Sequence, residues 1–479
     1  MPSEKTHYQS PLEARYASPE MSEIWSDHRK FSTWRKLWLA LAEAQQQLGL
    51  NISDAQLAEL RDHQEDLDYK KAAEYEAKLR HDVMAHVHTL GEVAPLARPI
   101  IHLGATSQFV NCNTELIQLR DALNLISIKT ARVIDALAKF AEKHKSLPTL
   151  GFTHFQPAQP TTVGKRAAMW AYDLALALED LENKQDTLRF RGAKGTTGTQ
   201  ASFLDLFDGD ESKVEQLDVL ITEKMGWPPD RRFIITGQTY PRIVDAQVLG
   251  SLASTAAVCH KLATDIRLLA HRKELEEPFE KDQIGSSAMA YKRNPMRCER
   301  ACGMSRFVIN LAANPLQTAA TQWLERTLDD SANRRLTLPE AFLSLDGALD
   351  ILHNVTEGLI VYEHTIRANL MAELPFMATE NLMMEAVRRG ADRQEVHEII
   401  RRCSLSASRK IKEEGKPNDL LAQLQEEQVF MGVDFDAILD PALYVGCAPS
   451  QVARFVSEVV TPIRQRYLDH LHASQVLRV

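Results

Sequence analysis

The chain of 479 residues has little that would tie it to a membrane or to secretion. No window approaches the ~18 uninterrupted apolar residues that a membrane-spanning helix needs. The opening residues, Met1 to Lys5, lack the apolar run of a secretory signal peptide. We therefore expect a cytoplasmic protein without membrane partners, and short signals that are read by receptors stay open.

Clustered cysteine and excess positive charge are also lacking. The six cysteines are scattered and form no CxxC pair, which argues against a disulfide framework and against structural zinc. A formal charge of −9 argues against broad nucleic-acid binding through a basic surface. A local group of arginines can still bind an anion inside a cleft, because the field there depends on nearby charges. The net negative charge therefore does not forbid a small anionic ligand.

The segment from Arg80 to His88 holds three histidines, at 81, 86 and 88. Such a group invites a metal site. The HExxH pattern is absent, however, and no carboxylate-rich partner is evident. We therefore predict neither a metal nor a cofactor, and we interpret His86 and His88 as structural.

The apolar pattern predicts helices throughout. Hydrophobic residues make up 44% of the chain, enough to bury a large core. Helical spacing of Trp34, Leu37, Trp38 and Leu41 predicts a helix over 31–48 that stops at Gly49. Further helical patterns run from about 69 through 88, over 113–145, over 162–189 and over 245–275; beyond 365 shorter helices are expected, separated by Pro375, Gly415 to Pro417, and Pro441. We predict an all-α fold with an N-terminal domain (1–111), a central bundle (112–364) and a C-terminal domain (365–479).

The least ordinary stretch runs from Gln283 to Arg300 and contains Gly285-Ser286-Ser287 followed by Lys292-Arg293-Asn294-Pro295. It is too polar for a core and too specific for a solvated linker. Its serines and main-chain N–H groups can surround an anion, while the two cations supply charge. The alternative is a helix connection with incidental polar residues.

Two more polar segments carry chemistry. Gly151 to Thr162 holds His154 followed by two prolines, which predicts an irregular loop with one histidine that can exchange protons near neutrality. Thr106 and Ser107 precede a long predicted helix, whose free N–H groups and dipole favour a carboxylate. Helix capping is the alternative reading for these two hydroxyls.

Two further segments, one in the N-terminal arm and one after the polar stretch at 283–300, carry arginines. Arg15 and Tyr16 form a pair in the N-terminal arm, suited to an anion or to simple anchoring. The run from Trp323 to Arg335 holds three arginines and Ser331, which would grip phosphate or carboxylate. A solvated charged face is the alternative reading of that run.

The segments around Thr106, His154 and Ser286 resemble, in order, the three shared regions of the fumarase/aspartase superfamily. Members of this superfamily eliminate fumarate from succinyl-bearing substrates. The resemblance covers essentially the whole chain. The chain departs from the pattern at Ala290, where many members carry proline, and at Cys112, where an acidic residue is common. The arm and the arginine run are similar to the animal-type branch that acts on succinylated purine nucleotides. Another amine lyase of the superfamily and a catalytically silent helical scaffold are the alternatives.

What the resemblance implies is specific. The fold is all-α with a central long-helix bundle, assembled as a homotetramer whose active sites are shared between subunits. Ser286 is the base, His154 the acid, and Lys292 stabilises the carbanion-like intermediate; His81 assists. The residues implied in substrate binding are Arg15, Tyr16, Arg80, His81, Asp82, Thr106, Ser107, Gln238, Asn294, Arg300, Arg326, Ser331 and Arg335.

Overall fold

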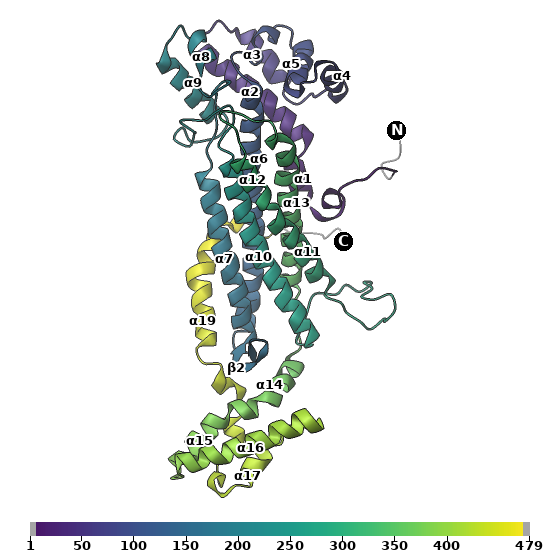
Figure 1. Ribbon diagram of the computed structural model, residues 1–479, viewed down its shortest axis with the longest axis vertical. Helices are drawn as coiled ribbons and strands as arrows, with labels where there is room; N and C mark the ends of the chain where they lie inside the picture. Colours follow the sequence, from purple (N-terminus) through teal and green to yellow (C-terminus); the bar gives the residue numbers. More distant parts are fainter. Residues whose placement is uncertain (1–5, 473–479) are drawn as a thin grey trace.

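The computed structural model describes residues 6–472 and is built around a long helical bundle (Figure 1). Smaller helices cover each end of the bundle. Helix α6 packs on α7 and α13, α10 packs on α7 and α11, and α11 packs on α13. The bundle helices are α6 (Ser107–Lys143), α7 (Val163–Thr187), α10 (Ile243–His271), α11 (Met296–Leu311), α12 (Ala313–Ala320) and α13 (Asp330–Glu357).

Helix α6 is buried on more than one side, because it packs against α2 as well as α7 and α13. Its apolar residues therefore surround much of the helix instead of forming one stripe. The buried cation Lys129 is paired with Asp346 at 2.5 Å and with Asp350 at 2.8 Å, both on α13. Pairing of this kind offsets the cost of removing the charges from water.

The N-terminal arm is fastened to the same carboxylate. Ser18 donates its N–H (2.7 Å) and its hydroxyl (3.1 Å) to Asp346. Gly347 lets the arm approach, since a Cβ there would meet the Tyr16 carbonyl oxygen at 2.6 Å. The N-terminal helices are η2 (Leu12–Tyr16), α1 (Pro19–Ile24), α2 (Asp27–Gln47), α3 (Asp54–Asp62), α4 (Tyr69–Leu79), α5 (Asp82–Val93) and η3 (Arg98–Ile100). Two helices from the middle of the chain, α8 (Ala201–Leu206) and α9 (Glu211–Lys224), lie at the same end of the bundle as α3 to α5 (Figure 1).

The helix expected from about 69 through 88 is in fact two. Helix α4 ends at Leu79, and Arg80 takes a left-handed conformation with φ 54°. Helix α5 starts afresh at Asp82 with His81 as its N-cap. Sequence periodicity alone misses this break because Arg80 is not a glycine, the usual residue at such a position.

The predicted irregular loop around His154 is a β-hairpin at the end of the bundle away from α5 (Figure 1). Strand β1 (Pro148–Thr153) pairs with β2 (Gln156–Thr162), and a register shift between Thr149 and Gly151 absorbs the irregularity. A two-stranded ribbon consists only of edge strands, so it tolerates prolines that a central strand would reject. His154 and Phe155 form the turn with φ 54° and 56°, the positive values that tight hairpins of this twist require.

The C-terminal helices form a second, smaller core. Leu382, Phe430 and Phe435 are among its buried residues. Pro375 does not separate helices as expected but lies inside α14, near its C-terminal end. The short strands β3 (Leu275–Glu276) and β4 (Ile360–Val361) pair before this part of the chain, and both contact the main core. The C-terminal elements are α14 (Glu363–Met377), α15 (Thr379–Arg388), α16 (Arg393–Glu414), α17 (Leu420–Gln425), η4 (Gln428–Phe430), α18 (Phe435–Ile438) and η5 (Pro441–Tyr444).

The final helices return to the bundle. Helix α19 packs along α7, and Val452, Val460 and Ile463 join the main core. The returning elements are α19 (Ala448–Phe455), η6 (Val456–Val460), α20 (Thr461–Arg466) and η7 (Leu468–His470). None of the helices within residues 6–472 is long and apolar enough to cross a membrane.

Candidate active site

One group of expected site residues comes together within a single chain. His81, Asp82, Ser107 and Arg335, here called the His81 cluster, come from the start of α5, the start of α6 and the start of α13. The main-chain N–H of Met84 donates to His81 Nδ1 at 3.2 Å. The proton of a neutral His81 is therefore on Nε2, which lies 3.2 Å from Ser107 Oγ.

Arg335 joins this cluster through an ion pair. Its Nη2 donates to Asp82 Oδ2 at 3.0 Å, and the other carboxylate oxygen accepts the N–H of Val83 at 2.8 Å. The Arg335 side chain is 59% exposed, so the pair faces solvent. An exposed pair of this kind is worth only ~1 kcal/mol or less. A ligand with a strong anionic group can therefore displace Asp82 from Arg335.

The N-terminus of α6 favours the carboxylate reading over capping. Thr106 occupies the N-cap position, but its side chain makes no capping hydrogen bond. Its Oγ1 is buried and has no partner in the part of the chain that is described. Ser107 is engaged with His81 instead of the helix. Thr106 Oγ1 and the first N–H groups of α6, which have no partner within the helix, are thus available to an anion, whereas the Ser107 hydroxyl must leave His81 to bind one.

The arginines expected to bind substrate are held in different ways. The guanidinium of Arg300 lies 5.9 Å from the centre of the Tyr16 ring, so arm and bundle meet there. Arg326 Nη1 donates to Asp330 Oδ1 at 2.7 Å, and the buried Arg242 binds the other oxygen of the same carboxylate. Arg15 is exposed on the arm.

Two of the expected contact loops are joined by the main chain. The N–H of Gln238 donates to the Glu325 carbonyl at 3.0 Å, which places Gln238 beside the run that carries Arg326. Ser331 lies at the start of α13, where its N–H donates to the Leu328 carbonyl. Arg80 is exposed between α4 and α5.

The segment 283–296, here called the signature loop, projects from the bundle between β3 and α11 (Figure 1). Asn294 Nδ2 donates to the Gly285 carbonyl at 2.8 Å and closes its base. Ser286 Oγ accepts N–H groups from Ala288 (3.3 Å) and Met289 (3.1 Å). Donors aimed at this oxygen favour its deprotonated form, as a serine base requires. Lys292 is exposed.

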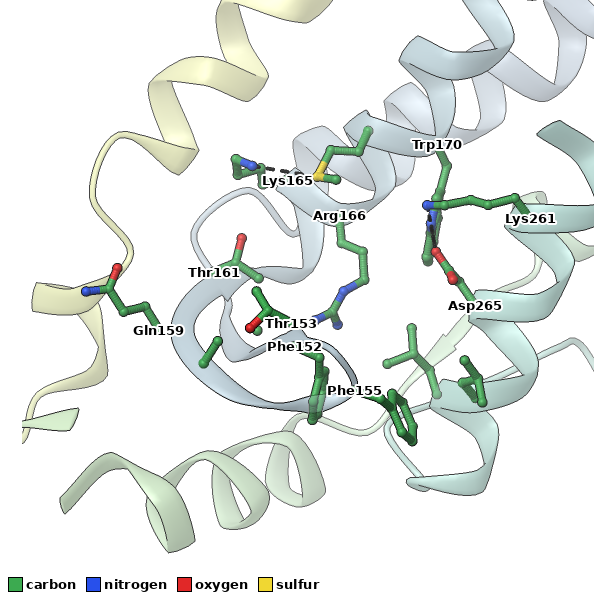
Figure 2. Close-up of a pocket in the computed structure, with 15 residues that line it drawn as sticks. Phe152, Thr153, Phe155, Gln159, Thr161, Lys165, Arg166, Trp170, Lys261 and Asp265 are labelled. Carbon is green, nitrogen blue, oxygen red and sulfur yellow. Dashed lines mark hydrogen bonds and ion pairs between the residues drawn. The ribbon is translucent and has the colours of Figure 1, made fainter. Parts of the chain in front are cut away.

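His154 is exposed at the hairpin tip, and no hydrogen bond or ion pair involves its side chain within residues 6–472. A pocket of about 610 Å³ lies between this hairpin, α7 and α10 (Figure 2). Inside it, Asp265 accepts from Trp170 Nε1 at 2.7 Å and pairs with Lys261 at 2.8 Å. His154 does not line this pocket, so the pocket of one chain is not where the expected acid would act.

Helix α6 keeps the His81 cluster and the hairpin apart. Ser107 is its first residue, and the hairpin begins at Pro148, just after its end at Lys143. A helix of 37 residues is about 55 Å long. His81 and His154 of one chain are therefore at opposite ends of a rigid rod.

One residue near the site, Lys30, was not detected in the sequence, and the structure explains one departure from the family pattern. The half-buried Lys30 on α2 lies against the Phe31 and Trp34 rings. A lysine on a regular amphipathic helix does not stand out in the sequence, so the pattern did not mark Lys30 as a site residue. Cys112, the departure from the acidic pattern, donates to Gln108 Oε1 at 3.3 Å and lies 3.9 Å from Arg242. Since Arg242 has Asp330 as a partner, it does not need an acid at 112.

No group of three or more histidine, cysteine or acidic side chains in the described range is arranged to hold a metal ion. The long-helix bundle agrees with the family comparison, which assigns the chain to the lyases. The family described as "Lyase" matches residues 13–310, and the family described as "Adenylosuccinate lyase C-terminus" matches 375–455.

Relatives agree over the full length. The chain is 52% identical to the adenylosuccinate lyase of Saccharomyces cerevisiae, covering 98% of each chain, and 49% identical to that of Schistosoma mansoni, covering 97% of each. In structure it is similar to a 3-carboxy-cis,cis-muconate lactonizing enzyme from Pseudomonas putida, with TM-score 0.80, 27% identity, and coverage of 95% of this chain and 99% of the other. The chain belongs to the adenylosuccinate lyase family.

Proposed function

We propose that this enzyme eliminates fumarate from adenylosuccinate, releasing AMP, and from succinylaminoimidazole carboxamide ribotide (SAICAR), releasing the carboxamide ribotide AICAR. The observation that carries the proposal is the His81 cluster at the start of α6, which offers hydroxyls, helix N–H groups and a displaceable arginine to an anionic substrate. Full-length similarity to adenylosuccinate lyases supports the choice of substrate.

The reaction needs one base and one acid. Ser286 removes the proton from the carbon beside a succinyl carboxylate, and the electron pair left on carbon expels the nucleobase nitrogen as the carbon–carbon double bond forms. His154 protonates that nitrogen, which leaves well only when protonated. Lys292 and the N–H groups of the signature loop stabilise the negative charge that develops on the carboxylate. Closure of the loop over substrate would exclude water and strengthen these interactions.

The remaining residues bind substrate. In this proposal the phosphate and carboxylates are held by residues of the arm, the break before α5, the start of α6, the loops around 238 and 326, the signature loop, α11 and α13. They are Arg15, Tyr16, Arg80, His81, Asp82, Thr106, Ser107, Gln238, Asn294, Arg300, Arg326, Ser331 and Arg335.

We propose further that the enzyme is a homotetramer whose active sites combine segments of different subunits. The length of α6 supports this, because one chain holds His81 and His154 at opposite ends of the helix. Exposed apolar side chains on the bundle support it too, since a partner would cover them. They include Met169, Leu176, Leu268, Phe307, Ile309 and Leu316.

The division into three domains, 1–111, 112–364 and 365–479, also stays a proposal. Its boundaries fall close to the starts of α6 and α14. A cytoplasmic location is proposed on the scattered cysteines, which suit a reducing compartment.

An assay with two substrates tests the function. The purified protein is incubated separately with adenylosuccinate and with argininosuccinate, and fumarate and AMP are measured. Fumarate and AMP from adenylosuccinate alone are expected. Turnover of argininosuccinate alone would assign the chain to a different amine lyase, and turnover of neither would indicate a silent scaffold.

A further inference from the structure

Lys30 occupies a position that costs stability. It lies in the first turns of α2, where the positive end of the helix dipole disfavours a cation. Burial and the neighbouring Arg335 lower the pKa of its ammonium group. Within residues 6–472 it forms no ion pair at 4.0 Å or less that would offset these costs. A residue that breaks local rules in this way points to a role other than stability.

The surroundings of Lys30 connect it to the His81 cluster. Its Nζ lies 5.1 Å from the centre of the Phe31 ring and 5.2 Å from that of Trp34. Both rings contact His86, Phe31 stacking on it at 3.9 Å, and His86 is one turn from Asp82 on α5. These contacts place the ammonium group beside the face of α5 that carries His86 and, one turn earlier, Asp82.

Asp82, Glu115, Asp27 and Arg335 are the charged groups that act on Lys30. Glu115 already has a partner, since it pairs with Arg334 at 2.8 Å. Asp82 is different, because its Oδ2 is bound to Arg335, the exposed arginine that the proposed function assigns to substrate. When Arg335 turns to a substrate anion, that oxygen loses its cation.

We propose that Lys30 is a positioning residue that supplies the positive charge beside Asp82 when Arg335 leaves it for an anionic group of the substrate. Lys30 attracts Asp82 and repels Arg335, and both effects favour the release of the arginine. The proposal rests on the proposed function, which makes Arg335 a substrate ligand. Lys30 acts through Asp82 and does not itself touch substrate.

Charge and packing at position 30 can be separated by substitution. Lys30→Met keeps an unbranched side chain against Phe31 and Trp34 but removes the charge, so Asp82 holds Arg335 more tightly and KM for adenylosuccinate should rise about tenfold. The value of kcat should stay within about twofold, because the chemical step is unchanged. Lys30→Arg should restore most of the affinity. The matched control is Lys36→Met on the same helix, whose ammonium pairs with Glu65 instead, and it should leave KM unchanged.

Two results would overturn the proposal. One is an unchanged KM in Lys30→Met. The other is a lower unfolding temperature with KM unchanged or not restored by Lys30→Arg, which would make Lys30 merely structural. A double-mutant cycle with Asp82→Asn adds a sharper requirement: the effect of Lys30→Met should shrink once Asp82 has lost its charge. Fully additive effects would mean that Lys30 acts directly on the anion, contrary to the proposal.

Calorimetric binding separates this inference from the proposed function. AMP and fumarate are titrated into wild-type and Lys30→Met protein. Weaker binding of AMP alone would identify phosphate as the group that Arg335 takes, and weaker binding of fumarate alone would identify a carboxylate; either supports the role of Lys30. Equal binding of both probes to the two proteins overturns it. Absence of lyase turnover in the wild type would instead sink the proposed function, while the binding comparison still tests Lys30.

Discussion

The His81 cluster and the two segments that carry His154 and Ser286 are held in opposite ways. Within one chain the cluster is already assembled by His81 with Ser107 and by Asp82 with Arg335. His154, by contrast, is exposed at a hairpin tip, and Ser286 lies on a loop that projects from the bundle. In the proposed function, one chain prepares the binding of an anion by itself, whereas proton transfer needs a second surface.

The sharpest test of this contrast removes the proposed base. Ser286→Ala should lower kcat by roughly a thousandfold, because it deletes an interaction used chiefly in the transition state. Substrate binding should change little, since the His81 cluster is intact. Steady-state kinetics and AMP titration measure the two quantities. Near-normal turnover would move the role of base to Ser287.

Mixing two inactive proteins tests whether the second surface belongs to another subunit. His154→Ala and Ser286→Ala proteins are combined in equal amounts, gently dissociated and allowed to reassemble. If different chains supply the two residues, roughly a quarter of the sites receive an intact pair, by the symmetry of a closed oligomer. Activity should rise to about that fraction of wild type. Exchange confirmed by fluorescent labels, with activity still at the level of the separate mutants, would show that each site is built within one chain.

Substitution of arginines tests the anion-binding side of this contrast, both in the His81 cluster and beyond it. Lysine in place of Arg15, Arg326 or Arg335 keeps the charge but loses the planar fork that binds phosphate or carboxylate through two parallel hydrogen bonds. KM should therefore rise about tenfold with a smaller change in kcat. Michaelis constants for the three variants measure this effect. Unchanged constants in all three would return these arginines to a solvated charged face.

The last test concerns stability instead of activity, and it probes how firmly α2 and α5 hold the cluster. Burial lowers the pKa of His86 to about 4, below its ordinary value of 6.5. The folded state therefore binds fewer protons than the unfolded state between these values, and stability present above pH 6.5 is lost as the pH falls toward 4. The loss due to His86 can reach roughly 3 kcal/mol.

Urea unfolding at several pH values measures this dependence. His86→Phe, which cannot titrate and retains a ring beside Phe31, should show a shallower loss of unfolding free energy than wild type. Part of the slope should survive, because burial also lowers the pKa of His102 to about 4. An identical slope in the variant would show that His86 is not held neutral in a fixed environment.

How far the sequence predicts this structure depends on the distance over which each signal acts. The long helices follow from local apolar periodicity, which is why the helix expected at 31–48 and the one at 113–145 are present as α2 and α6. Predictions from local sequence were wrong where the backbone takes an unusual conformation. Arg80 breaks a helix without glycine, and the prolines near His154 permit a hairpin because both strands are edges.

Contacts between distant segments could not be predicted from local pattern. Ser107 meets His81 across 26 positions, and Arg335 meets Asp82 across 253. Motif resemblance named all four residues without indicating which would touch. Lys30 was not named at all, because a lysine on a regular helix is normally a solvated side chain. Helical spacing puts Lys30 beside Trp34, but only the fold sets the Phe31 and Trp34 rings against His86.

The length of α6 limits which insertions the sequence can accept during evolution. A single residue inserted in this helix would move one end by about 1.5 Å and turn it by about 100° relative to the other. If each site combines opposite ends of neighbouring subunits, that one insertion would misalign every site in the assembly at once. Insertions between α16 and α17, where residues 415–419 join two helices of the smaller core, carry no such penalty. Homologous chains should therefore vary in length at the surface of the C-terminal helices while α6 keeps its count of residues.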